Sequence, residues 1–153
     1  MKKFIILLSF LSIIFTGCNL KTPTEKYKLA KFSQTKNHIP VAIMIYEDIY
    51  KNNPKSKEAP LALYELAKIY TENSDIPKTI AGLKSIAYCD SIIKKYPNSD
   101  LKLKAIYYKA LTYQYKVKDY KNATIIYHNI ISNYPNSKYA TLSKEMLETL
   151  GEK

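Results

Sequence analysis

Arginine is absent from this chain of 153 residues, in which all 24 basic side chains are lysines. The planar guanidinium of arginine is the group best suited to contact phosphates and base edges, so its absence argues against a dedicated nucleic-acid-binding protein. The formal net charge is nevertheless +11. Because the lysines are scattered, we interpret most of them as solvated, with a secondary tendency to lie against anionic lipid head groups.

Glycine and cysteine are also scarce, with three and two residues. Three scattered glycines exclude a glycine-rich phosphate-binding loop. Cys89 falls within an apolar helical pattern and is expected to be a small buried side chain. His38 is expected in a turn, and His128 lies next to Tyr127 on a helix without a cysteine or carboxylate at metal-ligand spacing, so we predict structural or solvated roles for both. No Ser/His/Asp set stands out, and we expect a protein that is not an enzyme and holds no metal or cofactor.

A long apolar run is missing as well. The run from Phe4 to Phe15 has 12 residues and is interrupted by serines, whereas a membrane-spanning helix needs about 20. Lys2 and Lys3 precede this run, and small residues follow it. A basic start, a short apolar core and a small-residue cut site predict a secretory signal peptide over residues 1–17.

The stretch Phe15-Thr16-Gly17-Cys18 resembles a bacterial lipobox, although leucine is more usual where Phe15 stands. The resemblance implies cleavage before Cys18 and lipidation of its sulfur, including acyl chains such as palmitate. Residues 18–23 would then be a short tether between the membrane and the folded domain. The alternative is an ordinary signal peptide followed by an incidental cysteine.

The rest of the sequence predicts an all-α fold, because apolar residues recur at helical spacing and no segment alternates with period two for long. We expect Thr24 and Asp119 to cap helices and Gly82 to interrupt one. The predicted helices cover about 24–36, 40–52, 56–71, 77–95, 99–117, 119–133 and 137–150.

One stretch, Tyr96-Pro97-Asn98-Ser99, returns as Tyr134-Pro135-Asn136-Ser137 and more loosely as Asn53-Pro54-Lys55-Ser56. The residue before a proline is pushed out of the α region, which ends a helix. The serine two positions later can cap the next helix. The sequence therefore predicts three helix pairs, over residues 24–56, 57–98 and 99–136, followed by a capping helix over 137–150.

Positions counted back from these prolines are also shared. Small residues stand twelve before (Ala42, Ser85, Ala123), and isoleucine stands five before (Ile49, Ile92, Ile130). With the tyrosines or cysteine eight before (Tyr46, Cys89, Tyr127), this pattern resembles the tetratricopeptide repeat. The resemblance implies a solenoid in which the first helix of each repeat lines a concave groove.

When Ala30, Ala67 and Ala110 are aligned, residues of the three repeats coincide at three equivalent positions. The resemblance implies that these residues line a groove for an extended or C-terminal segment of a partner protein. The alternative is that the tyrosines pack between repeats and the lysines are solvated. The predicted groove residues are Tyr27, Tyr64 and Tyr107, then Lys31, Lys68 and Leu111, and finally Gln34, Thr71 and Gln114.

A lipobox cysteine, a short tether and repeats closed by Tyr-Pro-x-Ser are together similar to the BamD family of outer-membrane assembly lipoproteins. The similarity implies an outer-membrane lipoprotein facing the periplasm, which binds a BamA-like barrel protein and segments of unfolded β-barrel precursors. BamD proteins usually carry more repeats than this chain has room for. Two alternatives stay open, namely a repeat-lipoprotein adaptor for cell-wall, division or pilus assembly, and an exported enzyme or small-ligand binder.

Overall fold

The computed structural model describes residues 22–73 and 75–151, and within them it contains helices and no strand. The all-α prediction is therefore confirmed. The predicted signal peptide and Cys18 lie outside the described residues. The helices are α2 (Pro23–Thr35), α3 (Ile39–Asn52), α4 (Glu58–Glu72), α5 (Lys78–Lys95), α6 (Leu101–Thr112), the π-helix η1 (Tyr113–Val117), α7 (Tyr120–Asn133) and α8 (Lys138–Thr149).

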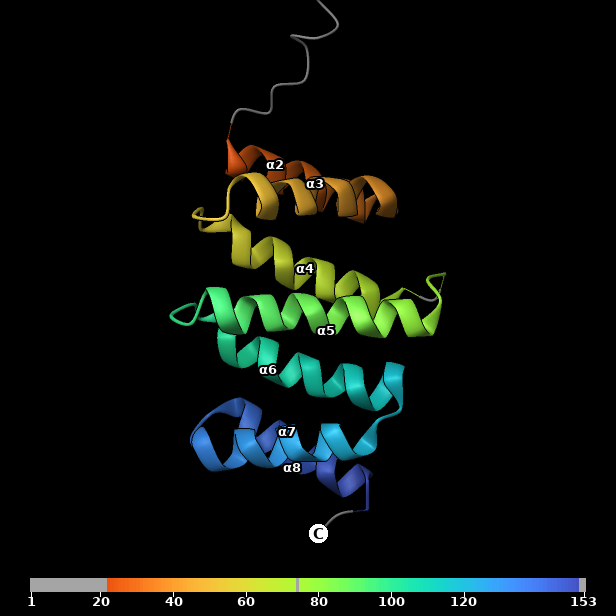
Figure 1. Ribbon diagram of the computed structural model, residues 1–153, viewed down its shortest axis with the longest axis vertical. Coiled ribbons are helices and arrows are strands. Elements are labelled where there is room, and N and C mark those ends of the chain that lie inside the picture. Colours follow the sequence, from red (N-terminus) through yellow and green to blue (C-terminus); the bar gives the residue numbers. More distant parts are fainter. Residues whose placement is uncertain (1–21, 74, 152–153) are drawn as a thin grey trace, which may run out of the picture.

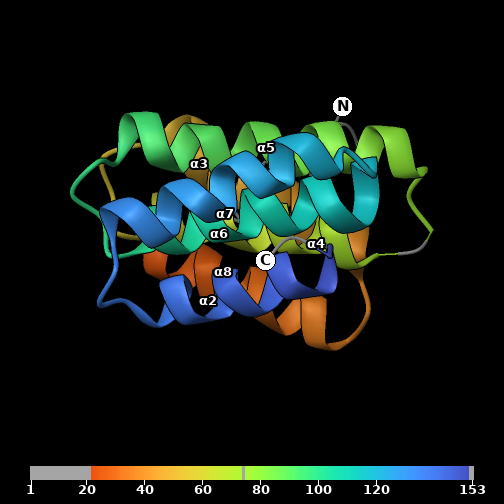
Figure 2. The same cartoon turned by 90° about the horizontal axis from the view of Figure 1, so that it is seen from below.

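The helices stack in antiparallel pairs along the long axis of the molecule (Figure 1). The pairs are α2 with α3, α4 with α5 and α6 with α7, and α8 packs on the last pair. Seen along the stack, α3, α5 and α7 lie on one side, while α2 and α8 lie farthest from it and α4 and α6 lie between (Figure 2). The chain is thus a tetratricopeptide-like solenoid whose first helices, α2, α4 and α6, form its concave side.

Buried small residues set the spacing within and between the pairs. Ala30, Ala42, Ala67, Ala110 and Ala123 are all fully buried. Small side chains at fixed places let two helices approach closely, and the isoleucines five residues before the prolines fill the space beside them with 0% exposure. Three core clusters follow one another along the stack, as expected when each repeat buries its neighbour's face.

Two expected helix caps outside the proline stretches, Asp119 and Thr24, can be compared with the structure. Asp119 accepts a hydrogen bond from the Asn122 backbone N–H at 3.0 Å, which confirms it as the cap of α7. The predicted cap Thr24 is wrong, because Thr22 caps α2 in a capping box with Glu25. The Thr24 hydroxyl instead donates to Glu58 Oε1 at 2.6 Å and joins the first repeat to the second.

The three proline stretches share one backbone turn but not one cap. Ser137 accepts from the Ala140 N–H at 3.2 Å and caps α8 as predicted. Ser99 accepts from the Leu101 N–H at 3.2 Å. The prediction for Ser56 is wrong, because α4 begins at Glu58 without a side-chain cap and the buried Ser56 hydroxyl has no partner among the described residues. The shared feature is the bond from each serine N–H to the carbonyl three residues earlier, at 3.0 Å in all three copies.

The interruption expected at Gly82 is also wrong, since α5 runs through this position. Gly82 is buried where η1 crosses α5, and a Cβ built on it would lie 2.7 Å from Val117 Cγ2. The glycine is therefore required by a close approach rather than by a break. The helix predicted over 99–117 changes to π-helical geometry at Tyr113 and is closed by Lys118, whose φ is +64°.

Candidate partner-binding groove

Tyr27 opens the predicted ladder on α2 and is only partly buried. Its ring lies 5.7 Å from that of Tyr46, and its hydroxyl donates to Glu65 Oε1 at 3.5 Å. Burial, with the nearby Glu65 carboxylate, raises the pKa of Tyr27 to about 12. Lys31 Nζ contacts the same carboxylate oxygen at 3.2 Å. Glu65 on α4 thus contacts two predicted groove residues of the preceding repeat, Tyr27 and Lys31.

Tyr64 holds the equivalent place on α4 but is only 9% exposed. Its ring meets that of Tyr108 on α6 edge to face, with 5.5 Å between the ring centres. Lys104 Nζ lies 4.3 Å from the centre of the Tyr64 ring, a cation–π contact that the sequence analysis missed. Lys104 could have been noticed because it lies one helical turn before Tyr107.

Tyr107 continues the ladder on α6, where it contacts two further rings. The centres of Tyr127 on α7 and Tyr139 on α8 lie 6.0 and 5.4 Å from its own. Leu111 is partly buried against the same cluster. Tyr64 therefore packs against a ring of the next repeat, which is the alternative that the sequence left open. Tyr27 and Tyr107 instead contact rings of their own repeat and, for Tyr107, of α8. Whether their exposed edges also bind a partner stays a prediction.

The two predicted glutamines are used inside their own repeats. Gln34 accepts a hydrogen bond from the Tyr46 hydroxyl at 3.0 Å, and Gln114 accepts one from Tyr127 at 2.7 Å. Gln114 is only 5% exposed. Both amides thus hold together the two helices of a repeat, and Gln114 has little surface left for a partner.

Thr71, the residue of this register in the second repeat, belongs to a cluster of three hydroxyls. Its Oγ1 donates to Ser85 Oγ at 2.7 Å and lies 3.1 Å from Thr112 Oγ1. Ser85 and Thr112 are fully buried and lie 3.0 Å apart. The cluster satisfies its own polar groups at the junction of α4, α5 and α6, so we assign it a structural role.

What stays accessible on the concave side is mainly cationic. Lys68 on α4 is partly exposed and forms no ion pair among residues 22–73 and 75–151. The Lys31 side chain is 42% exposed despite its contact with Glu65. Lys104 adds an ammonium group over the Tyr64 ring, and Lys31 shares the Glu65 carboxylate with the Tyr27 hydroxyl. Such a surface suits an extended segment that carries carboxylates between apolar side chains.

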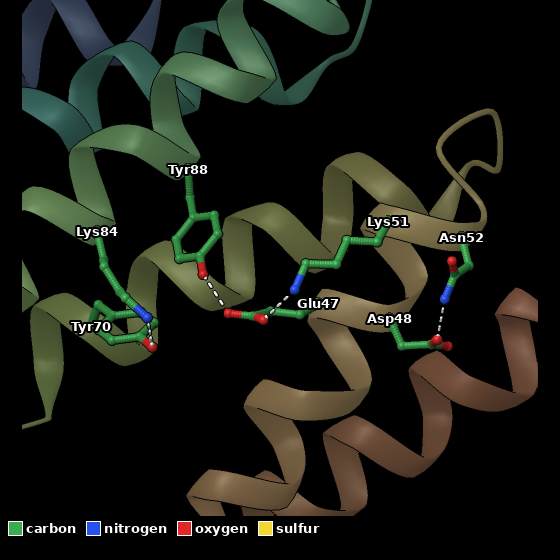
Figure 3. A network of polar contacts seen from close by, with 7 residues as sticks. All are labelled: Glu47, Asp48, Lys51, Asn52, Tyr70, Lys84 and Tyr88. Atoms are coloured by element: carbon green, nitrogen blue, oxygen red, sulfur yellow. Dashed lines mark hydrogen bonds and ion pairs between the residues drawn. The ribbon is translucent and has the colours of Figure 1, made fainter.

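A second polar network joins α3, α4 and α5 away from the ladder (Figure 3). Tyr88 on α5 donates to Glu47 on α3 at 2.8 Å, and Lys51 contacts the other carboxylate oxygen at 2.8 Å. Lys84 donates to the Tyr70 hydroxyl at 3.0 Å. The hydrogen bond from Lys51 is the main reason that the pKa of Glu47 lies below its usual value. The bond between Tyr88 and Glu47 joins the first repeat to the second, and none of these groups is part of the candidate groove.

Among the described residues, no helix combines the length and apolar character that crossing a membrane requires. No group of three or more histidine, cysteine or acidic side chains is placed to hold a metal ion in that part of the chain.

Stacked helix pairs with a lysine-edged tyrosine ladder define a helical-repeat protein of the kind that binds other proteins. Residues 104–137 match the family model of the tetratricopeptide repeat. This match covers most of the third predicted repeat, with its closing proline, so the chain contains a tetratricopeptide repeat and the resemblance stated from the sequence is supported. No curated protein matches the chain. Repeats of this family generally mediate protein–protein interaction, and the match specifies no partner.

Proposed function

We propose that the chain is a membrane-anchored scaffold that binds another cell-envelope protein along the concave side formed by α2, α4 and α6. The observation that carries this proposal is the shared register of Tyr27, Tyr64 and Tyr107, with Lys104 over the Tyr64 ring and Lys31 on the carboxylate that also binds the Tyr27 hydroxyl. Tyrosine provides contact area at a low entropic cost, and lysines add attraction to carboxylates of the partner. The function is binding rather than catalysis.

The more specific form of the proposal is a BamD-like role in the outer membrane, with the chain facing the periplasm. It is supported by the lipobox-like residues 15–18, the short tether and the helical repeats that begin at Pro23. The partner would be a BamA-like barrel protein, and segments of unfolded β-barrel precursors would be further ligands. In this form, lipid on Cys18 holds the scaffold at the membrane.

The second candidate is an adaptor lipoprotein for another envelope process, such as cell-wall and division coordination or pilus assembly. One observation favours it. Three helix pairs and α8 are present in the described residues, fewer than BamD proteins usually carry, and BamD contacts that depend on later repeats have no counterpart among them. The two candidates share fold and anchor and differ in partner.

Affinity purification of the full chain, tagged at its C-terminus, from detergent-solubilised membranes tests the proposal. The wild type is compared with a Lys31→Glu/Lys68→Glu variant, and Lys55→Glu/Lys94→Glu, at two exposed positions off the groove, serves as the charge-matched control. We expect the groove variant alone to lose a specific envelope protein. A BamA-type barrel would support the BamD-like form, and a different envelope protein would support the adaptor. Equal recovery by all three chains would contradict groove binding.

A further inference from the structure

Four apolar side chains lie exposed at the first-repeat end of the stack and form what we call the N-terminal end face. They are Leu29 and Phe32 on α2 and Val41 and Met44 on α3, with exposures of 37%, 58%, 42% and 64%. In Figure 1, α2 and α3 form the terminal layer of the described stack. A cluster of this size at one end of a small domain indicates a surface that contacts something.

The repeat register explains why Leu29 and Phe32 are open, whereas Val41 and Met44 stand at positions whose second-repeat counterparts, Lys84 and Ala87, are exposed as well. Leu29 and Phe32 stand where Leu66 and Ile69 stand in the second repeat, and those two are 0% and 3% exposed because they join the core shared by the first and second repeats. No described helix precedes α2, so the same positions remain uncovered. Leu29 and Phe32 therefore form a stacking surface on which no described helix is stacked.

The last helix shows what a solvated end of a solenoid looks like. Along its length α8 exposes polar residues, including Thr141, Lys144 and Glu148. Ends of solenoids need such polar outer faces to remain soluble. Ile125 and Tyr120 are exposed on α7 near that end, but the outer helix there is polar, whereas α2 presents Leu29 and Phe32.

We propose that the N-terminal end face lies on the anionic surface of the membrane that holds the lipidated Cys18. The inference rests on the lipid anchor in the proposed function. Cys18 precedes Pro23 by five residues, which span at most about 17 Å when extended. Phe32 lies about 14 Å along α2 from Pro23. A chain anchored at Cys18 therefore keeps this face within reach of the bilayer.

The charges around the face fit an anionic surface. Lys28 on α2 and Lys36 directly after this helix are exposed, and Lys36 Nζ lies 5.7 Å from the centre of the Phe32 ring. The nearby acidic groups are engaged, since Asp48 pairs with Lys26 at 2.6 Å and Glu25 accepts in the capping box of α2. Apolar side chains flanked by lysines are typical of helices that lie in the head-group region.

This contact would orient the whole scaffold. With α2 and α3 parallel to the bilayer, the stack stands away from the membrane and α4, α6 and α8 lie progressively farther out. The groove then opens sideways, where a membrane-embedded partner and its soluble parts can both reach it.

The experiment uses the full chain expressed with its signal, purified as the mature protein and reconstituted in phosphatidylcholine vesicles containing phosphatidylglycerol. An environment-sensitive fluorophore is attached to a Met44→Cys variant. Ile125→Cys is the matched control. Met44 follows Ala42 by two residues, and Ile125 follows Ala123, the equivalent alanine of the third repeat, by two residues. The two side chains are 64% and 54% exposed. Cys89 is fully buried and does not compete for the label.

We expect a blue shift and several-fold stronger quenching by spin-labelled lipids at position 44 than at position 125. Adding Phe32→Glu should reduce the quenching at position 44 without moving that at 125. Mass spectrometry of the same chain determines separately whether Cys18 carries lipid. A lipidated chain with equal quenching at both positions would overturn the orientation alone, and a chain without lipid on Cys18 would overturn the anchor and the orientation together. Shielding of position 44 in detergent without vesicles would instead show that a second copy covers the face, and would also overturn the proposal.

Discussion

The Tyr127 hydroxyl donates a 2.7 Å hydrogen bond to the side-chain oxygen of Gln114, inside the third repeat. The first repeat has the same pair, with Tyr46 donating to Gln34 at 3.0 Å. In both repeats the bond joins the first helix to the second across a tightly packed interface. The second repeat has Cys89 at the tyrosine position and uses the hydroxyl cluster around Thr71 instead.

Replacing Gln114 by leucine should destabilise the fold. Tyr127 is fully buried, so its hydroxyl would lose its acceptor, and an unsatisfied buried polar group costs about 1–3 kcal/mol. Urea unfolding followed by circular dichroism measures the change in the free energy of unfolding.

The double variant Gln114→Leu/Tyr127→Phe is the control for this loss. Removing both polar partners should recover much of the lost stability, since no hydroxyl is left unpaired. A single variant as stable as the wild type would show that the bond contributes nothing.

Gly82→Ala should also destabilise, although alanine in a helix is normally favoured over glycine by about 0.5–1 kcal/mol. The new Cβ would come within 2.7 Å of Val117 Cγ2, and overpacking of this kind typically costs about 1–3 kcal/mol. In a Val117→Ala background the same change should instead stabilise. Thermal unfolding of the four chains checks this, and a stabilising Gly82→Ala in the wild-type background would contradict the close approach of η1.

Acid should weaken the contact between the first two repeats. Hydrogen bonds from Lys51 and Tyr88 hold the pKa of Glu47 below its usual 4.5. In the folded protein the Glu47 carboxylate is therefore harder to protonate than in the unfolded chain. The stability that Glu47 contributes is present above pH 4.5 and is lost as the pH falls through its lowered pKa. Glu47→Gln should flatten the decline of stability in this range, as measured by urea unfolding at several pH values. Glu148→Gln, on an exposed position of α8, should leave the decline unchanged.

The Cys89 thiol should be inert in the folded chain. It is fully buried, and burial raises its pKa to about 12, so the reactive thiolate is scarce at neutral pH. A maleimide reagent should modify Cys89 only at the rate at which the protein unfolds, and readily in urea. Fast modification under native conditions would show that α4, α5 and α6 do not enclose it.

The prolines and small residues were enough to predict the repeats, because a helix stop and close helix packing leave local patterns in the sequence. Caps were harder. Thr22 and Glu25 have the spacing of a capping box, and this spacing could have predicted Thr22 rather than Thr24 as the cap of α2. Ser56 does not cap α4, which begins at Glu58, and the Glu58 carboxylate accepts from Thr24 of the preceding repeat.

The candidate groove was predictable in register but not in exposure. Tyr64 and Tyr27 hold equivalent positions. Tyr64 is covered by a ring of the following repeat, Tyr108, which packs against it edge to face, whereas the ring beside Tyr27 is Tyr46 of the same repeat. Gln114 turns inward because Tyr127 lies opposite it as a donor. Such pairings depend on residues of other helices, which a register within one helix does not reveal.

The central claim is that a partner protein binds on the concave side, and site-specific photo-crosslinking in cells tests it most directly. A photoreactive residue replaces Lys68 on the groove helix α4 or, as control, the exposed Lys94 on α5. Our account predicts a discrete adduct with one envelope protein from position 68 and none from position 94. Adducts from position 94 alone, or the same adducts from both positions, would contradict it.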